Sequence, residues 1–272
     1  MVAALQVASG PSGTKTRRPF RCRIETEWIP VGRKGYQLLG VLPDRKGRID
    51  WEGIRLAAGE DDVRFLLPVG LSVPEEYGLP LFEGRRLGQE LMAIAGLYLL
   101  RKMQGTPRRL SVALYDPRGC MPGLAAALLP YAGEVRVVTR DPARFTAQEE
   151  WAMEAYGATF VVTEDKEALG GAALVLAPEG LGGFCPGGWV LSGVPETGRH
   201  VVDGYIPQVP AVWLDAVPDR IDPWLFLAAL YEEGAIPEIL SRPPVSLRCD
   251  GKILRTEEVL WRVAGLDIGI SV

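Results

Sequence analysis

The stretch that decides the fold is Leu110-Ser-Val-Ala-Leu-Tyr-Asp-Pro-Arg-Gly119-Cys-Met-Pro-Gly123-Leu-Ala, in which an apolar run meets a turn with two glycines. The run at Val112 to Tyr115 has no polar alternation, which is typical of a strand buried on both faces of a parallel sheet. The leucines and alanines that follow predict a helix over Leu124 to Tyr131. The stretch therefore predicts a strand, a glycine turn and a helix, the first unit of an α/β fold.

The same alternation of apolar runs and helical patterns continues along the middle of the chain. A second helix is predicted over Pro142 to Tyr156, with Gly157 just past its end. Further strands are predicted at Val135 to Thr139, Thr159 to Thr163, Ala173 to Ala177 and Val212 to Leu214. Strands without polar alternation, separated by helices, predict a Rossmann-like, doubly wound parallel sheet over residues 108–220. We expect the Val112 strand to be central, with the Val135 strand parallel beside it.

The segments outside this core predict a tail, a lobe and an extension. Residues 1–19 contain turn formers and like charges, so we expect a mobile tail. Residues 20–107 predict a smaller N-terminal α/β lobe, and residues 221–272 a helix-hairpin-helix extension packed on the core. Residues 180–210 are rich in Gly and Pro and predict a long loop with at most one strand, Trp189 to Ser192. The elements predicted for the lobe are strands at Arg21 to Trp28, Tyr36 to Leu42 and Val63 to Val69, and helices at Asp50 to Ala58 and Gly84 to Gln104.

Composition excludes several classes of function. A net charge of −4 and the interspersed acidic and basic residues argue against a nucleic-acid partner. The four cysteines lie far apart with a single histidine, so no metal site or disulfide framework is predicted. The apolar run Leu91 to Leu100 is too short for a membrane span, and the N-terminus has no secretory pattern. We therefore expect a cytoplasmic protein with no membrane or nucleic-acid partner.

The glycine turn is a candidate phosphate site. In dinucleotide-binding proteins such glycines permit a tight turn and close backbone approach, and free N–H groups at the helix start hold the pyrophosphate. Gly119 and Gly123 have that placement, although the full Gly-x-Gly-x-x-Gly pattern is missing and Pro122 lacks an N–H donor. The alternative interpretation is an ordinary strand-to-helix turn.

A ribose-binding position is expected at the end of the second strand. Asp141 lies 141 − 119 = 22 residues after Gly119, near the spacing of ~20 at which an acidic residue binds ribose hydroxyls. Arg140 beside it is suited to the 2′-phosphate of NADP, so the pair leaves NAD and NADP both open. Asp141 is also placed to serve only as the N-cap of the next helix.

The order of strand, Thr139-Arg140-Asp141, helix and strand, ending in Ala-Ala-Leu-Val-Leu-Ala-Pro178-Glu-Gly, resembles the cofactor domains of shikimate dehydrogenase and glutamyl-tRNA reductase. The resemblance implies that Thr139 and Arg140 form the tip after the second strand, and that the strand before Pro178 ends beside a nicotinamide. Ala173 stands where these families have an Asp. Their substrate-binding and catalytic residues have no match here, so the dehydrogenase chemistry is not carried over.

Three hypotheses of function follow. The first is a protein that binds a small-molecule nucleotide of the NAD or NADP type, an oxidoreductase if it is an enzyme, with no catalytic residue assigned. The second is a degenerate Rossmann scaffold with a regulatory or assembly role. The third is a methyltransferase, because Asp116 to Gly123 resembles the Asp-x-Gly-x-Gly-x-Gly loop that binds S-adenosylmethionine, with one residue inserted. His200 is the one histidine, and a lone loop histidine is more often exposed than catalytic.

Overall fold

The computed structural model describes residues 1–8, 21–59, 62–103 and 110–265. The chain divides into two compact units: Met1–Gly84 with Val209–Ile239, and Arg85–Gln208 with Leu240–Val272. Both contain a sheet with parallel strands, so the fold is of the mixed α/β class. Residues 9–19 of the predicted tail lie outside the described residues.

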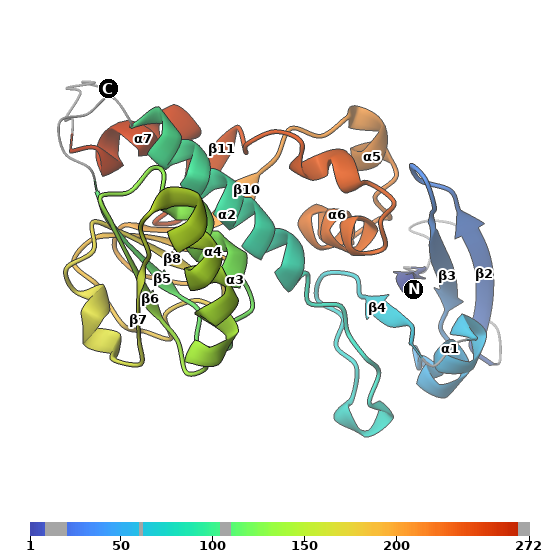
Figure 1. The fold of residues 1–272 in the computed structure, drawn as a ribbon. Helices are drawn as coiled ribbons and strands as arrows, with labels where there is room; N and C mark the ends of the chain where they lie inside the picture. The colour runs from blue at the N-terminus through green and yellow to red at the C-terminus, as the bar shows by residue number, and fades with distance from the viewer. Residues whose placement is uncertain (9–20, 60–61, 104–109, 266–272) are drawn as a thin grey trace. The chain divides into compact units, whose positions relative to one another are not determined.

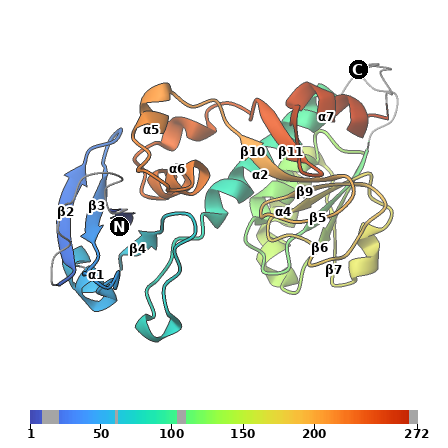
Figure 2. The same ribbon diagram turned by 180° about the vertical axis from the view of Figure 1, so that it is seen from behind.

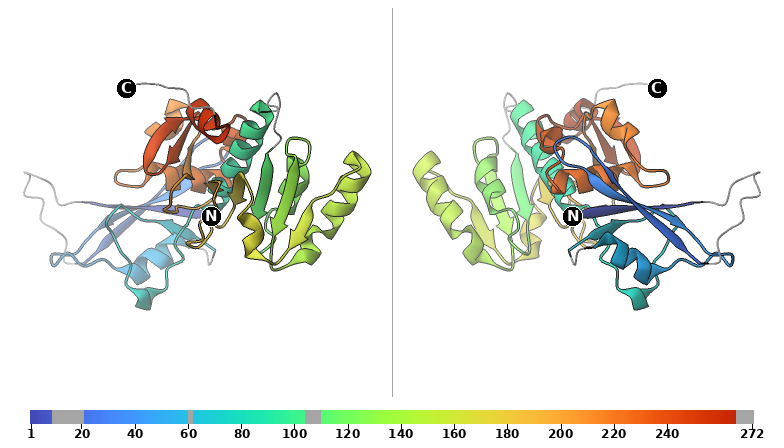
Figure 3. Two further views of the ribbon diagram at one scale, coloured as in Figure 1. Left: turned by 90° about the vertical axis from the view of Figure 1, so that its left-hand side faces the viewer. Right: turned by 90° about the vertical axis from the view of Figure 1, so that its right-hand side faces the viewer.

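The first unit is built on a four-stranded sheet in the order β2-β3-β1-β4. Its parallel strands β3 and β4 flank β1, and β2 pairs antiparallel with β3 at the edge. The helix α1 covers one face of the sheet (Figure 3, right panel) and buries Ile54 against Leu39 and Val41. The elements of this unit are β1 (Val2–Val7), β2 (Arg23–Ile29), β3 (Tyr36–Leu42), α1 (Trp51–Ala58), β4 (Arg64–Leu66), α5 (Ala211–Asp215) and α6 (Pro223–Glu232).

Residues distant in sequence complete the first unit. The ring of Tyr36 on β3 meets Phe226 on α6 edge to face at 4.9 Å, and its hydroxyl donates a hydrogen bond to the carbonyl of Ala216. Arg64 on β4 forms an ion pair of 2.9 Å with Glu232 on α6. Apolar packing together with these half-buried polar contacts accounts for why residues 209–239 group with residues 1–84.

The second unit contains an eight-stranded sheet in the order β12-β11-β10-β9-β8-β5-β6-β7. Six strands, from β5 to β10, are parallel, and their order matches the 3-2-1-4-5-6 order of a Rossmann sheet. The hairpin β11-β12 adds an antiparallel edge. The elements are α2 (Arg85–Lys102), β5 (Ser111–Tyr115), α3 (Pro122–Leu128), β6 (Glu134–Val138), α4 (Thr146–Tyr156), β7 (Val161–Thr163), β8 (Leu174–Ala177), β9 (Trp189–Ser192), β10 (Val201–Ile206), β11 (Ser246–Cys249), β12 (Lys252–Arg255) and α7 (Thr256–Val263).

The two faces of this sheet are covered differently. The helices α3 and α4 lie on the face turned to the viewer in Figure 1, and α2 packs beside α3 over β8, β9 and β10. The opposite face, seen in Figure 2, is covered by loops and short turns that bring Leu169 and Leu181 onto Val175 and Val190. Because α2 precedes β5 in the chain yet covers β8 to β10, the connections from β8 to β10 need no helix of their own.

The structure differs from the sequence prediction in four places. Val2–Val7, predicted within the tail, form β1 at the middle of the first sheet. The predicted strand at Val212 to Leu214 is helical and belongs to α5. Val201–Ile206, predicted as loop, forms β10. The C-terminal elements are divided, with α6 in the first unit and β11, β12 and α7 in the second, so a single helix-hairpin-helix extension is not confirmed.

Candidate functional site

The candidate site is the carboxyl edge of the parallel strands in the second unit. Because β5 lies between β6 and β8, the turn after β5 is flanked by the residues that follow β6 and β8. Those segments carry all the predicted site residues. They are Gly119 and Gly123 after β5, Thr139, Arg140 and Asp141 after β6, and Pro178 after β8. A ligand in an open α/β sheet binds at such an edge, where the chain changes direction across the sheet, here between β5 and β8.

Asp116 is the central residue of this edge. Its side chain is fully buried, and its carboxylate accepts hydrogen bonds from the backbone N–H groups of Cys120 at 2.8 Å and Met121 at 2.7 Å. The N–H of Gly119 donates to the backbone carbonyl of Asp116, and Pro122 has no N–H. The donors from Gly119 to Pro122 that a pyrophosphate would use are therefore satisfied within the turn or absent.

Arg144 covers the glycine of the turn. Gly119 has a φ of +62°, and a Cβ added there would lie 2.6 Å from Cδ of Arg144. The Arg144 guanidinium forms an ion pair with Asp141, Nε to Oδ2 at 3.1 Å, and also donates to the carbonyl of Gly119 at 3.4 Å. The backbone of Gly119 thus faces an arginine side chain, and the carboxylate predicted to bind ribose is neutralised by the same arginine.

The remaining predicted residues have different surroundings. Thr139 is buried, and its hydroxyl oxygen accepts a hydrogen bond from the Asp141 N–H, so it shapes the tip of the turn. Asp141 occupies the N-cap position without a capping side-chain bond. Arg140 is exposed, and its backbone N–H donates to the carbonyl of Pro117. Pro178 is buried, and its carbonyl oxygen would lie 2.4 Å from a Cβ added at Gly193.

An ion pair that the sequence did not predict joins two of these loops. Arg118, on the turn after β5, pairs with Glu179, which directly follows Pro178. The Glu179 side chain is largely buried, so the pair fixes the position of one loop against the other. Opposite charges directly after two strands that the predicted sheet order makes neighbours are the signal that would have indicated this pair.

A groove lies on the helix side of the same edge. It has a volume of about 650 Å³ and runs between α2, from Arg86 to Ile94, and the start of α3, from Cys120 to Leu124. Arg86 and Glu90 form an ion pair of 2.9 Å on its α2 side. A Cβ added at Gly123 would meet nothing within 4 Å, so this glycine borders open space.

The single histidine lies away from the carboxyl edge, and no cysteine among the described residues belongs to a group that could hold a metal ion. His200 precedes β10 and stacks on Trp189 at the start of β9, with ring centroids 4.8 Å apart, so it lies at the amino edge of the sheet. Within the part of the chain that the structure describes, no three His, Cys, Asp or Glu side chains are grouped to hold a metal ion. No helix among the described residues has the length and apolar character to cross a membrane.

The arrangement defines the class of the second unit as a Rossmann-type α/β sheet with a short, Asp-capped glycine turn. No protein-family model and no curated protein sequence matches the chain. Among solved structures, a lysine cyclodeaminase, studied for its recognition of L-lysine, L-ornithine and L-2,4-diaminobutyric acid, is similar over 94% of this chain and 76% of its own, with 14% identity and a TM-score of 0.29. A similarity at this level carries no argument about function, and the fold assignment rests on strand order.

Proposed function

We propose that the second unit is a Rossmann-type scaffold with a regulatory or assembly role, and that its glycine turn receives no dinucleotide pyrophosphate. The observation that carries this proposal is the buried Asp116 carboxylate, which binds the N–H groups of Cys120 and Met121. A pyrophosphate would compete for these donors and would meet the negative charge of Asp116 directly beneath them.

Two further contacts support the same proposal. A dinucleotide needs close approach to a bare glycine and a free carboxylate for the ribose hydroxyls. Here the side chain of Arg144 covers Gly119 and pairs with Asp141. Binding a dinucleotide in the usual manner would therefore require both Asp116 and Arg144 to give up their contacts. S-adenosylmethionine has no pyrophosphate, so it would require only Arg144 to release Asp141, which would have to bind its ribose.

Calorimetric titration of the full chain tests this proposal. We expect no heat of binding with NADPH, NADH or S-adenosylmethionine at millimolar ligand concentration. Binding with a Kd of about 1 μM corresponds to a free energy near −8 kcal/mol and would be detected readily at this ligand concentration. A Kd in the micromolar range for any of the three ligands would contradict the scaffold proposal.

The second candidate function is NADP binding, and the exposed position of Arg140 favours it. Among the described residues its guanidinium forms no hydrogen bond or ion pair, and the residue lies two positions after the end of β6 at the carboxyl edge. An unpaired guanidinium at this position is suited to bidentate contact with a 2′-phosphate. If NADP binds, the Arg144 side chain would have to move away from Gly119 and give up its hydrogen bond to the Gly119 carbonyl.

An arginine substitution separates the two candidates. If NADP binds, Arg140→Ala should weaken NADPH by about 10- to 150-fold, the equivalent of about 1.5–3 kcal/mol for a hydrogen bond to a charged group, with little effect on NADH. Arg101→Ala, which removes an exposed arginine from the last turn of α2, is the matched control for net charge. Equal losses for both cofactors in the Arg140 variant would exclude a 2′-phosphate contact.

A further inference from the structure

The first unit contains a second candidate ligand site, on the face of its sheet opposite α1. Gln6 on β1 and Glu25 on β2 both pair with Gly40 on the strand between them, so the three residues form one row across the sheet. Leu39 and Val41, on either side of Gly40, point to the other face and pack against α1. Because Gly40 has no side chain, the middle of the row is bare and forms the floor of a hollow.

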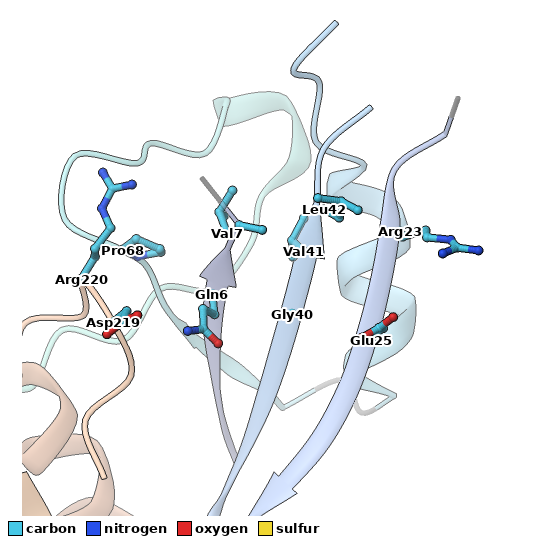
Figure 4. Close-up of a pocket in the computed structure, with 11 residues that line it drawn as sticks. Gln6, Val7, Arg23, Glu25, Gly40, Val41, Leu42, Pro68, Asp219 and Arg220 are labelled. Atoms are coloured by element: carbon cyan, nitrogen blue, oxygen red, sulfur yellow. The ribbon is translucent and has the colours of Figure 1, made fainter. Parts of the chain in front are cut away.

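The wall of this hollow comes from two loops. Pro68 follows β4, and Asp219 and Arg220 precede α6 (Figure 4). Arg220 has a φ of +64°, an unfavourable backbone conformation for a residue with a side chain. It is held there by an isolated bridge between Pro68 and Ile221, beside which the N–H of Val69 donates to the Arg220 carbonyl at 2.6 Å. Backbone strain of this kind is concentrated at functional sites.

The hollow collects polar side chains of both charges at the carboxyl ends of β1 and β3. Figure 4 shows Asp219 and Arg220 on one side and Arg23 and Glu25 on β2 on the other, with Gly40 between them. For Gln6, Glu25, Asp219 and Arg220, no side-chain hydrogen bond or ion pair is recorded within the described ranges. The volume of the hollow, about 590 Å³, lies in the range of small-molecule sites.

We propose that this hollow binds a zwitterionic small molecule of the amino-acid class, with its carboxylate at Arg220 and its ammonium group at Asp219. The charges carry the assignment: each side of the hollow offers one guanidinium and one carboxylate, Arg220 with Asp219 on the loop before α6 and Arg23 with Glu25 on β2. Gln6 adds an amide that both donates and accepts. A ligand with a single charge would leave part of this set uncompensated. The position also agrees with the general placement of ligands at the carboxyl ends of parallel strands. This site lies within the first unit and does not depend on the function of the second.

Ligand chemistry gives the first test. Each of the free L-amino acids is added at millimolar concentration while the thermal unfolding of the full chain is followed, because a ligand that binds the folded state raises the melting temperature. We expect at least one amino acid to raise it, and its amide and its N-acetyl derivative, which lack the carboxylate and the ammonium charge, to have no effect. The absence of a shift with every amino acid would overturn the proposal. An equal shift with either derivative would do the same.

Substitution of the floor gives the second test. A Cβ added at Gly40 meets its nearest atoms, in Glu25, only at 3.8 Å, so Gly40→Val extends into the hollow without a backbone clash. We expect this variant to fold and to lose the amino-acid response. Thr26→Val, on the neighbouring strand β2 and paired with Leu39 on the other face, is the matched control and should respond as the wild type does. An unchanged response in Gly40→Val would place the ligand elsewhere.

Arg220→Gly keeps the test decisive if Gly40→Val does not fold. Glycine adopts a positive φ without strain, so the loop keeps its conformation while the guanidinium is removed. We expect the amino-acid affinity measured by calorimetry to fall by about tenfold or more, the usual effect of losing a hydrogen bond to a charged group. The melting temperature without ligand should change little. Affinity equal to that of the wild type would refute the role of Arg220 in binding the carboxylate.

Discussion

Replacing Asp116 by alanine tests the closed glycine turn directly. The substitution removes a buried carboxylate that accepts hydrogen bonds from Cys120 N at 2.8 Å and Met121 N at 2.7 Å. A hydrogen bond to a charged group contributes about 1.5–3 kcal/mol, and two such bonds give about 3–6 kcal/mol. Cys120 is exposed and Met121 is partly exposed, so we expect water to reach the freed amides, and the cost of burying the charge is also removed. We therefore expect a net loss of about 2–4 kcal/mol in the free energy of unfolding.

The loss should be measured by thermal and denaturant unfolding followed by circular dichroism. For a unit of this size, about 1 kcal/mol shifts the melting temperature by about 2–4 °C, so we expect a decrease of roughly 5–15 °C. Asp50→Ala is the matched control, because Asp50 is an exposed N-cap that accepts a single bond from Gly53 N at 2.9 Å. Its loss should be close to about 1 kcal/mol. A loss in the Asp116 variant no larger than in this control would refute the reasoning.

The same variant tests why the turn is closed. With the carboxylate removed, the N–H groups of Cys120 and Met121 become free donors at the start of α3. We expect inorganic pyrophosphate to raise the melting temperature of Asp116→Ala while leaving that of the wild type unchanged. Equal stabilisation of both proteins would show that the wild-type turn is open to phosphate, and would favour the NADP candidate.

Three further predictions concern packing and the thiols. Gly88→Ala should lower the free energy of unfolding by about 1–3 kcal/mol through overpacking, because the new Cβ would lie 2.4 Å from the backbone oxygen of Gly193. Gly123→Ala has open space around it and should raise the free energy of unfolding by about 0.5–1 kcal/mol. The two variants should shift the denaturant midpoint in opposite directions. Leu91→Asp, at a fully buried position of α2, should unfold the second unit, and an unchanged melting curve would contradict the packing of α2 on the sheet. Burial raises the pKa of the Cys249 thiol from 9.0 to about 11, so its stabilising contribution is complete below pH 9 and is lost as the pH rises towards 11. Iodoacetamide at pH 8 should therefore modify exposed Cys120 well before Cys249, as peptide mass spectrometry would show.

The core of the second unit was predictable because its elements are specified locally. The β5 strand is an apolar run with a buried centre, and β6 contains three buried valines. Their parallel pairing, with Val112 opposite Val135, agrees with the prediction. The hairpin around Asp250-Gly251 was also predictable, since both residues adopt the positive φ that such a two-residue turn requires. In each case a few neighbouring residues determine the structure.

The elements that were missed depend on distant partners. Val2–Val7 contains two alanines and a glutamine, and it becomes a strand because Tyr36–Leu42 and Arg64–Leu66 flank it. Val201–Ile206 contains Asp203 and a glycine, both poor strand formers, and is held in the sheet by pairing on both sides. Val212–Leu214 illustrates the opposite error, because three apolar residues are too few to distinguish a strand from a helix.

The candidate site was predictable in position but not in chemistry. The placement of Gly119, Arg140 and Pro178 after neighbouring strands follows from the order of elements in the sequence. The direction of the Asp116 carboxylate does not, because it depends on how the turn brings two backbone N–H groups to one side chain. The contact of Arg144 with Gly119 likewise depends on the angle at which the chain leaves β6.

The closed turn explains how α3 begins without a ligand. A dinucleotide-binding turn leaves its first N–H groups unsatisfied, to be paired by the pyrophosphate when it binds. In this chain Pro122 contributes no N–H, and the Asp116 carboxylate accepts hydrogen bonds from the N–H groups of Cys120 and Met121. The energy that a bound pyrophosphate would supply, about 1.5–3 kcal/mol for each charged hydrogen bond, is thus supplied permanently by a side chain. The turn is stable in the absence of any nucleotide, and that stability is what a scaffold needs and what a cofactor site does not require.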